Sequence, residues 1–596
     1  MLSLLNTTFT NTLRQGFSLV SSLLNKLKKR VADDGGTFEN EACTEAELKK
    51  LNKKGLLSKV TVLTTPTAYN VRKLYSIKPE GLGDEFVTNG DFSNGDTGWV
   101  KGTAPSSTQQ VVNGSLVTYS GSASDSNNAL SRTDTLQGYN NKMYKLELSR
   151  SNFVNGSIGY LRLDGAYDSS NIISFSEGTS IIYFTAYRDF THIRFFASSA
   201  ESGYTIDNVS VKEVLNADFE TDRGSLATRV NEQGYIDATL ANAEPRIDYL
   251  SGCGSFLLEP TRTNIQIRSE EFDNSVWNKT RSSITSNDAT SPSGLLNADT
   301  LEGVSGTTSY VYDGISVASG SVYTISVFAK YIDIEEFIIN VFGQSGQGNF
   351  NISNGTVTSS TGTVTEPKIE NYGNGWYRCS VKFTANATGN VNYGFLLSNG
   401  IGKSVNIWGA QFELGSYPTS YIPTTTAAVT RNAESANDAG SPTLFNDLEG
   451  VLMAEISALA NDGTFRFLSV SDGTTSNRIN IMFNTNNTLD AFVGAVGTFD
   501  SVVDILNFNK AAIKYKSGDY AFWVNGFEVE VSTSTSGTHS GLNQLNFDIG
   551  NGSNDFYGNT KQIQYYNSAL TDSELEALTS WVSFSDMANA QLYTIQ

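Results

Sequence analysis

The sequence predicts a mostly β protein built from several sandwich domains, with helices limited to the first 60 residues and one short segment near the end. Three observations support this prediction. The 53 glycines and the aromatic content of 11% are typical of many short strands joined by tight turns. Alternating apolar and polar residues recur from about residue 85 onward. Two long segments also share strand motifs at nearly equal spacing, which indicates an internal duplication.

Length and charge limit the class of protein. The 596 residues are too many for a single core and predict roughly three to five domains. The net charge is -20, yet residues 1–60 carry ten basic and six acidic side chains, so that segment is net +4 and the remainder -24. The acidic body disfavours binding to nucleic acid. No apolar run reaches the roughly 18 residues of a membrane-spanning helix.

The N-terminal segment, residues 1–65, is predicted to be a short helical anchor. Its apolar residues recur at helical spacing and form a stripe made of Phe9, Leu13, Phe17, Val20, Leu24 and Leu27. Thr44 and Glu47 predict a capping box for a second helix that ends near Gly55. We expect the stripe to dock on a partner protein; packing within the chain and lying on a membrane surface are the alternatives. Docking predicts that deletion of residues 1–60 leaves folded β domains.

The three cysteines are odd in number and far apart in the sequence, at Cys43, Cys253 and Cys379. This spacing predicts neither a disulfide framework nor a zinc site. The first residues lack the basic region of a signal peptide. We therefore expect synthesis and assembly in a cytoplasm.

Two segments, residues 85–216 and 265–425, carry the duplicated motifs. Each has an aromatic pair at its start, a tyrosine in a middle strand and an alternating strand at its end: Phe92, Trp99, Tyr144 and Gly203–Val211 in the first, and Phe272, Trp277, Tyr323 and Val405–Phe412 in the second. The spacing from the first aromatic residue to the tyrosine is 52 residues in one segment and 51 in the other. The segments are therefore predicted to share one fold.

Both segments resemble the galactose-binding-like jelly roll of carbohydrate-binding modules. The resemblance rests on the opening Asn-Gly-Asp-Phe with a following tryptophan, and on the closing Ile206-Asp207-Asn208-Val209. It implies tandem β-sandwiches that bind sugars without a cofactor. A structural calcium ion near Asp91 or Asp207 is also compatible with the resemblance, but spacing alone assigns no metal ligands.

The C-terminal segment, residues 443–596, is predicted to be a different β-sandwich, joined to the second jelly roll by a linker at 426–442. Alternating strands surround Phe467 and Trp523, and Asn525-Gly526 marks a hairpin turn. Together with the late Leu570-Thr571-Asp572-Ser573-Glu574-Leu575, these strands resemble the concanavalin-A-like or laminin-G-like lectin sandwich. In that fold the late motif marks a short helix.

Residues 217–264 carry three motifs in order: Ala227-Thr228-Arg229-Val230-Asn231, then Pro245–Tyr249, then Phe256–Pro260. They resemble a connector that recurs in fibre, spike and adhesion proteins of tailed bacteriophages, with Phe256 in place of the usual leucine. Residues 66–84, with Leu74-Tyr75-Ser76 and Gly83-Asp84, resemble the start of the same connector. The first jelly roll is therefore predicted to be inserted into the connector, with its two chain ends close together.

Three tryptophans, Trp99, Trp277 and Trp523, are the candidate carbohydrate-binding residues, because sugars stack on indole rings. Packing in the core is the alternative for each. We expect no catalytic residue. The two histidines, His192 and His539, are predicted to lie in a strand and in a solvated loop, and no metal or nucleophile motif accompanies them.

The phage resemblance implies a fibre or spike protein at the virion surface, bound to other virion proteins and to host glycans. A homo-oligomer is expected, and a trimer is favoured by analogy with the family. A head fibre or tail component that binds no receptor is the first alternative. A glycan depolymerase, with two paired carboxylates, is the second.

Overall fold

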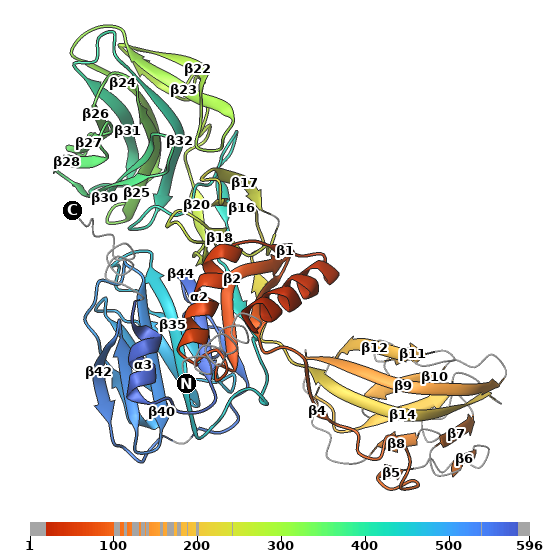
Figure 1. The fold of residues 1–596 in the computed structure, drawn as a ribbon. Helices are drawn as coiled ribbons and strands as arrows, with labels where there is room; N and C mark the ends of the chain where they lie inside the picture. Colours follow the sequence, from red (N-terminus) through yellow and green to blue (C-terminus); the bar gives the residue numbers. More distant parts are fainter. Residues whose placement is uncertain are drawn as a thin grey trace, which may run out of the picture. The chain divides into compact units, whose positions relative to one another are not determined.

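The computed structural model describes residues 19–581 except 101–107, 113–115, 122–129, 133–137, 139–141, 155–158, 164–171, 176–179, 187–188, 198–201, 241 and 538. The chain forms two compact units: one contains residues 79–216, and the other contains everything before and after them (Figure 1). Antiparallel sheets dominate both units, which confirms the predicted mostly β class of paired-sheet sandwiches. Among the described residues, no helix is long and apolar enough to cross a membrane.

Residues 79–216 form a sandwich of two sheets. One sheet has the order β12 (Ser180–Thr185), β9 (Met143–Val154), β14 (Ser202–Val214), β7 (Leu116–Gly121) and β6 (Thr108–Val112), with β4 (Leu82–Glu85) also paired to β14. The other has the order β11 (Ile172–Phe175), β10 (Gly159–Leu163), β13 (Ile193–Ala197), β8 (Leu130–Arg132) and β5 (Trp99–Val100). The chain enters and leaves this unit side by side, because the Leu215 N–H donates to Gly81 O at 3.1 Å.

The other unit is continuous across the same interruption. Strand β3 (Lys73–Lys78) pairs with β15 (Phe219–Asp222), with Phe219 opposite Leu74. The Ser76 N–H donates to Asp218 Oδ1 at 2.8 Å, and the Ala217 N–H donates to Ser76 Oγ at 3.0 Å. The chain therefore departs from one strand of a sheet and returns to the neighbouring strand.

Residues 265–425 form the second sandwich. Its β24 sheet has the order β21 (Asn278–Thr280), β24 (Thr308–Val317), β31 (Gly389–Ser398), β26 (Glu336–Phe342), β27 (Gly346–Asn351) and β28 (Thr356–Thr361). Its β25 sheet has the order β22 (Ser282–Thr290), β23 (Leu296–Gly303), β32 (Ser404–Leu414), β25 (Val322–Tyr331), β30 (Trp376–Thr384) and β29 (Val364–Asn371).

The two sandwiches share the same opening detail. The Phe272 and Trp277 rings lie 4.9 Å apart, and the Phe92 and Trp99 rings lie 5.0 Å apart. Each indole N–H donates to the carbonyl of a residue with positive φ, Arg268 in the second sandwich and Asn89 in the first. The motif that repeats in the sequence therefore repeats as one local geometry.

The C-terminal sandwich borrows strands from the connector. Its larger sheet has the order β34 (Ser435–Asn437), β15, β3, β2 (Val62–Asn70), β44 (Gly558–Tyr566), β35 (Glu449–Ala458), β40 (Asn509–Lys516), β41 (Tyr520–Val524) and β42 (Phe527–Ser532). Strands β1 (Thr37–Phe38), β18 (Ile247–Asp248) and β19 (Ser255–Leu258) also belong to it. The facing sheet is β39 (Gly497–Phe499), β38 (Leu489–Val493), β37 (Arg478–Phe483), β36 (Arg466–Ser471) and β43 (Gln544–Asn546).

This sharing corrects the predicted boundaries at 65 and 443. Strand β2 runs through the first boundary and pairs with β44 near the C-terminus. The short helix α3 (Asp572–Thr579) follows β44 at the position that the lectin-like motif predicts, with the capping box formed by Thr571 and Glu574. The connector is therefore part of the C-terminal sheet and does not merely link two domains.

The N-terminal helices cover the outer side of this sheet, so the described part of the predicted stripe packs within the chain and not on a partner. Residues 19–33 are helical, and α2 (Glu41–Lys53) follows. Val20, Leu24 and Leu27 of the predicted stripe are buried in one cluster with Leu48, Leu51, Met453, Trp523 and Tyr566. The remaining stripe residues, Phe9, Leu13 and Phe17, lie outside the described residues. Deletion of residues 1–60 would therefore expose a core, contrary to the expectation above.

Helix α2 also begins earlier than predicted. It starts at Glu41 after Asn40, so Thr44 lies inside the helix, where its hydroxyl contacts Thr65 and Thr67. The helix ends at Lys53 with Gly55 at positive φ, close to the predicted end.

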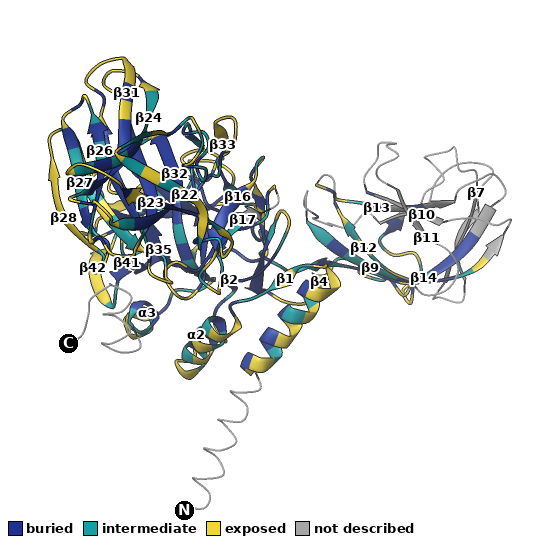
Figure 2. Cartoon of the chain, turned by 90° about the horizontal axis from the view of Figure 1, so that it is seen from above, coloured by how far each residue is buried: buried dark blue, intermediate teal, exposed yellow. Residues whose placement is uncertain are grey.

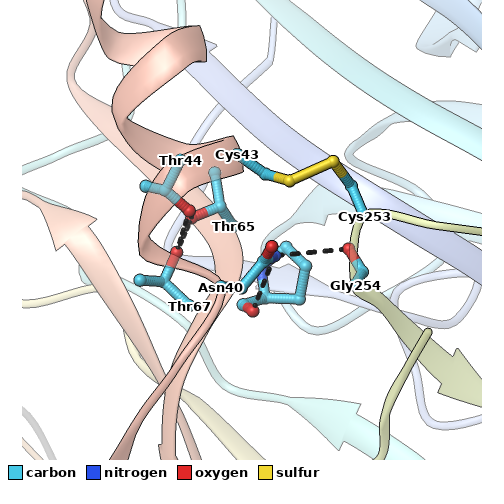
Figure 3. The surroundings of a disulfide bond; sticks show 8 residues. Asn40, Cys43, Thr44, Thr65, Thr67, Cys253 and Gly254 are labelled. Atoms are coloured by element: carbon cyan, nitrogen blue, oxygen red, sulfur yellow. Dashed lines mark hydrogen bonds between the residues drawn. A yellow bond between two sulfur atoms is a disulfide. The ribbon is translucent and has the colours of Figure 1, made fainter. Parts of the chain in front are cut away.

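A disulfide between Cys43 and Cys253 overturns the prediction that the cysteines form no bridge. Figure 3 shows Cys43 on α2 and Cys253 in the loop before β19, beside the Asn40 side-chain N–H, which donates to Gly254 O at 3.4 Å. The two cysteines are 210 residues apart in the sequence, and only folding of the connector against α2 brings them together. Cys379 is a free, buried thiol.

We expect the double variant Cys43→Ser/Cys253→Ser to lose up to about 5 kcal/mol of unfolding free energy, since the bridge closes a long loop in the unfolded chain. Urea unfolding of the wild-type and variant proteins measures the loss. Alkylation of the denatured, unreduced wild-type protein should label Cys379 and leave Cys43 and Cys253 unlabelled. Labelling of all three cysteines would contradict the bridge.

We expect the protein to fold without residues 79–216. Joining Lys78 to Ala217 through a short glycine–serine linker keeps the pairing of β3 with β15 and the hydrogen bonds of Ser76. Calorimetry should show a main unfolding transition within a few degrees of the wild-type one. As the matched control, removal of residues 265–425 should abolish that transition, because the connector packs on the second sandwich. Unfolding caused by the first deletion would refute the expectation.

Candidate functional site

The three predicted tryptophans are buried, which corrects their assignment as sugar platforms. Trp99, Trp277 and Trp523 are 5%, 1% and 8% exposed. Trp99 and Trp277 lie in the cores of the two sandwiches, and Trp523 faces the N-terminal helices. A stacking sugar needs an open ring face, and core packing leaves none on these indoles.

The remaining predicted residues do not form a reactive centre. His539 was expected in solvent, but it is 5% exposed, meets the Tyr515 ring edge-on, and has its pKa lowered by burial. His192 precedes β13 rather than lying in it. Asp91 accepts hydrogen bonds from Ser93, and Asp207 accepts one from the Asn208 N–H. Among the described residues, no three histidine, cysteine or acidic side chains are placed to hold a metal ion.

The connector covers one outer face of the second sandwich. Val230 and Ile236, from the ribbon of β16 (Ala227–Val230) and β17 (Ile236–Leu240), pack on the β25 sheet. There they form a second core with Phe328, Trp376, Trp408 and Tyr421. Among the residues that the structure describes, no such apolar cluster forms on the outer side of the opposite, β24 sheet. Buried and partly exposed residues alternate along β27, and Figure 2 shows the edge strand β28 in the colour of exposed residues.

Three aromatic rings gather on the outward side of the β24 sheet. Tyr310 and Tyr312 come from β24 and Phe342 from β26, and all three are partly exposed. Their centroids are 5.6 Å apart for the two tyrosines, and Phe342 lies 5.1 Å from Tyr310 and 6.0 Å from Tyr312. The rings therefore form one contiguous apolar platform.

Gly394 of β31 lies in close contact with the neighbouring strand β24 beside the ring platform. In the strand register it lies opposite Tyr312 on one side and Asn340 on the other. A Cβ at this position would come within 2.4 Å of Val311 O and 2.7 Å of Tyr312 Cβ. The missing side chain therefore allows β24 to lie this close to β31 beside Tyr312.

A row of amides continues the platform across β26 and β27. The Asn340 side-chain N–H donates to Gln347 Oε1 at 3.2 Å, and the Gln347 side-chain N–H donates to Asn349 Oδ1 at 2.9 Å. Asn349 in turn donates to Glu336 Oε1 at 3.2 Å. These bonds orient the amides. A primary amide has two N–H donors and an acceptor with two lone pairs, so each retains hydrogen-bonding capacity for a ligand.

We call this surface the amide–aromatic face. It consists of Tyr310, Tyr312, Glu336, Asn340, Phe342, Gln347, Asn349 and the exposed Asn392, which lies opposite Phe342 in the register. Apolar rings beside oriented amides can stack on the flat side of a polyhydroxylated ring and hydrogen bond to its hydroxyl groups. Glu336 is the one carboxylate among these residues, and Glu335 lies at the border of the face, where its Oε2 accepts the Asn351 side-chain N–H at 3.3 Å.

The face was not among the predicted sites, because tyrosine and phenylalanine supply its rings and no tryptophan belongs to it. The pattern Tyr310-Val311-Tyr312 places both tyrosines on one side of a strand, and Asn340-Val341-Phe342 does the same for an amide and a ring. Alternation therefore shows that β24 and β26 each have one side that carries aromatic or amide side chains. It does not show that the two strands belong to one sheet.

A separate cluster, made of charged side chains, is buried where the connector meets the second sandwich. Arg246 contacts both Glu259 and Glu434, Arg223 contacts Glu434 at 2.7 Å, and Arg431 contacts Glu259 at 2.8 Å. We call these five residues the junction network. All five are buried. Ser420 joins the network, donating to Glu259 and accepting from Arg246.

The junction network is structural and not catalytic. Burial would raise the pKa of Glu259, but Arg431 and Arg246 together lower it to about 2. The carboxylate thus stays ionised, paired and closed to solvent, whereas a general acid or base needs a pKa near the working pH and access to substrate.

Comparisons with known proteins find neither a protein-family model nor a curated protein that matches this sequence. Similar solved structures include carbohydrate-binding domains. One is the CBM40 of Ruminococcus gnavus IT-sialidase, with a TM-score of 0.21, 16% identity, and coverage of 24% of this chain and 94% of that one. Another is the tandem CBM22 pair of Paenibacillus barcinonensis Xyn10C, with a TM-score of 0.17, 10% identity, and coverage of 56% and 99%. A third is a putative carbohydrate binding protein from Bacteroides ovatus, with a TM-score of 0.20, 11% identity, and coverage of 47% and 81%.

We expect the junction network to make stability depend on pH in the acid range. The folded pKa of Glu259, about 2, lies below the ordinary value of 4.5. Its contribution, roughly 3 kcal/mol, is therefore fully present above about pH 4.5 and is lost as the pH falls toward 2. Glu259→Gln should cost about 3–5 kcal/mol at pH 7, because it leaves two buried arginines without this partner.

Urea unfolding at pH 7, 4 and 3 measures both effects. The gap between wild type and Glu259→Gln should narrow as the pH falls. Glu302→Gln, at an exposed position on β23, is the control and should change stability by less than about 0.5 kcal/mol. A gap that is constant with pH would show that the charge of Glu259 is not what stabilises the junction.

Proposed function

We propose that this protein is a fibre- or spike-type structural protein of a tailed-bacteriophage virion that adheres to host-surface glycans. The amide–aromatic face carries the proposal. It combines three clustered rings with oriented amides on a sheet face that the connector leaves open, and these are the groups that sugar recognition requires.

The virion assignment rests on the resemblance of the connector to those of phage fibres and spikes. The structure supplies a physical reason for two of its motifs. Arg246 of the Pro245–Tyr249 motif and Glu259 of the Phe256–Pro260 motif are partners in the junction network. The two motifs therefore supply the opposite charges of one buried ion pair.

Adhesion without catalysis is the activity we propose. A shallow sheet face binds a sugar weakly, so useful attachment needs many copies acting together. A homo-oligomer, which we propose to be a trimer, would repeat the face at the virion surface. Simultaneous engagement of repeated glycan epitopes then raises the avidity by roughly 10²–10⁴-fold over one site.

We expect Tyr312→Ala to lower the affinity of the full-length protein for its glycan by about tenfold, because it removes a stacking ring. Binding to an array of bacterial surface glycans, followed by titration of the strongest hit, provides the measurement. Tyr331→Ala is the matched control, since Tyr331 is an exposed tyrosine on the β25 sheet. Equal binding by both variants and the wild type would refute the face as the binding site.

A further inference from the structure

The amide–aromatic face carries almost no charge, and this limits what it can bind. The six strands of the β24 sheet, all of which the structure describes, contain three charged residues: Lys279, Asp313 and Glu336. Only Glu336 belongs to the outward face. The rings and amides around it are neutral.

The single lysine of these strands is already engaged away from the face. Lys279 lies opposite the buried Val311 in the register, and its Nζ donates to the carbonyls of Asp273 and Asn274 at 2.8 and 2.7 Å. Arg281 follows β21 at the end of the sheet, and its side chain lies against Gly306. Neither cation is a component of the platform.

The Asp313 carboxylate likewise forms its hydrogen bonds on the other side of the sheet. Its Oδ2 accepts the Gln266 side-chain N–H at 2.9 Å, and its Oδ1 accepts the Gly314 N–H at 2.7 Å. The net charge that a ligand meets on the face is therefore negative, on a chain whose total charge is -20.

From this charge distribution we infer that the face selects uncharged glycans and rejects those carrying carboxylate, sulfate or phosphate groups. The inference rests on the proposed function. A glycan anion placed on the face would lose water without gaining an arginine, a lysine or a helix N-terminus as a partner. It would also meet the field of Glu336. Hydroxyl and N-acetyl groups, in contrast, pair with amide donors and acceptors.

The length of the face favours an oligosaccharide over a single sugar ring. Tyr312, Gly394, Asn340 and Gln347 lie side by side across four strands, and Thr361 of β28 continues the same row. With about 4.8 Å between neighbouring strands, this row of five strands spans about 19 Å. A glycan chain laid across the strands meets the rings first and then the amides.

A glycan array probed with the full-length protein tests the inference. The neutral probes are cellotetraose, chitotetraose and uncharged O-chain polysaccharides; the anionic probes are sialyllactose, oligogalacturonate and acidic capsular polysaccharides. We expect hits among the neutral probes, with affinity that changes less than twofold between low and high salt and falls about tenfold in Tyr312→Ala.

A charge-introducing variant makes the test sharper. Asn392→Lys places a cation beside Phe342 and should raise low-salt binding of anionic probes several-fold, because it supplies the missing partner. Thr384→Lys, at an exposed position on the β25 sheet, is the matched control and should leave that binding unchanged.

The outcomes separate this inference from the proposed function. Hits confined to anionic probes, but still lost in Tyr312→Ala, would overturn the charge selection and keep the face as the site. Neutral hits insensitive to Tyr312→Ala, or no hits on the array, would overturn the proposed function and this inference with it.

Discussion

The junction network is the interaction on which the rest of the structure depends. Its arginines and glutamates come from the connector and from the linker after the second sandwich, and Ser420 adds that sandwich's last loop. Buried charges stabilise a fold only when each one is paired. Because Glu259 and Glu434 each serve two arginines, the loss of one segment leaves the others with unpaired charge. The network therefore requires the connector, the linker and the second sandwich to assemble together.

The position of the connector then decides which surface of the second sandwich is available. Val230 and Ile236 cover the β25 sheet, and this part of the connector does not cover the β24 sheet. That face carries rings and amides where the covered one carries buried tryptophans. The proposed sugar recognition relies on this division, since a binding platform needs exposed apolar area.

Burial of an apolar sheet face also explains why the N-terminal helices pack on the C-terminal sandwich. The outer side of the C-terminal sheet is apolar, and the N-terminal helices bury it together with Trp523 and Met453. The disulfide from Cys43 to Cys253 then ties those helices to the connector. In contrast, residues 79–216 enter and leave through neighbouring strands, and their sandwich has a core of its own.

The sequence by itself determined the fold class and the repeated sandwich motif, because both depend on local alternation, turn residues and short motifs. The sequence therefore predicted that one motif occurs twice, as Phe92 with Trp99 and as Phe272 with Trp277. Tertiary structure alone decided which side of each strand is covered. The alternation along a strand defines two sides but not which of them meets another layer. For this reason Trp277 and Trp523 were predicted to bind sugar, and Tyr310 and Tyr312 were not. The pairing of Cys43 with Cys253 and the joining of Arg246 to Glu434 also depend on contacts between residues far apart in the chain, which no local pattern encodes.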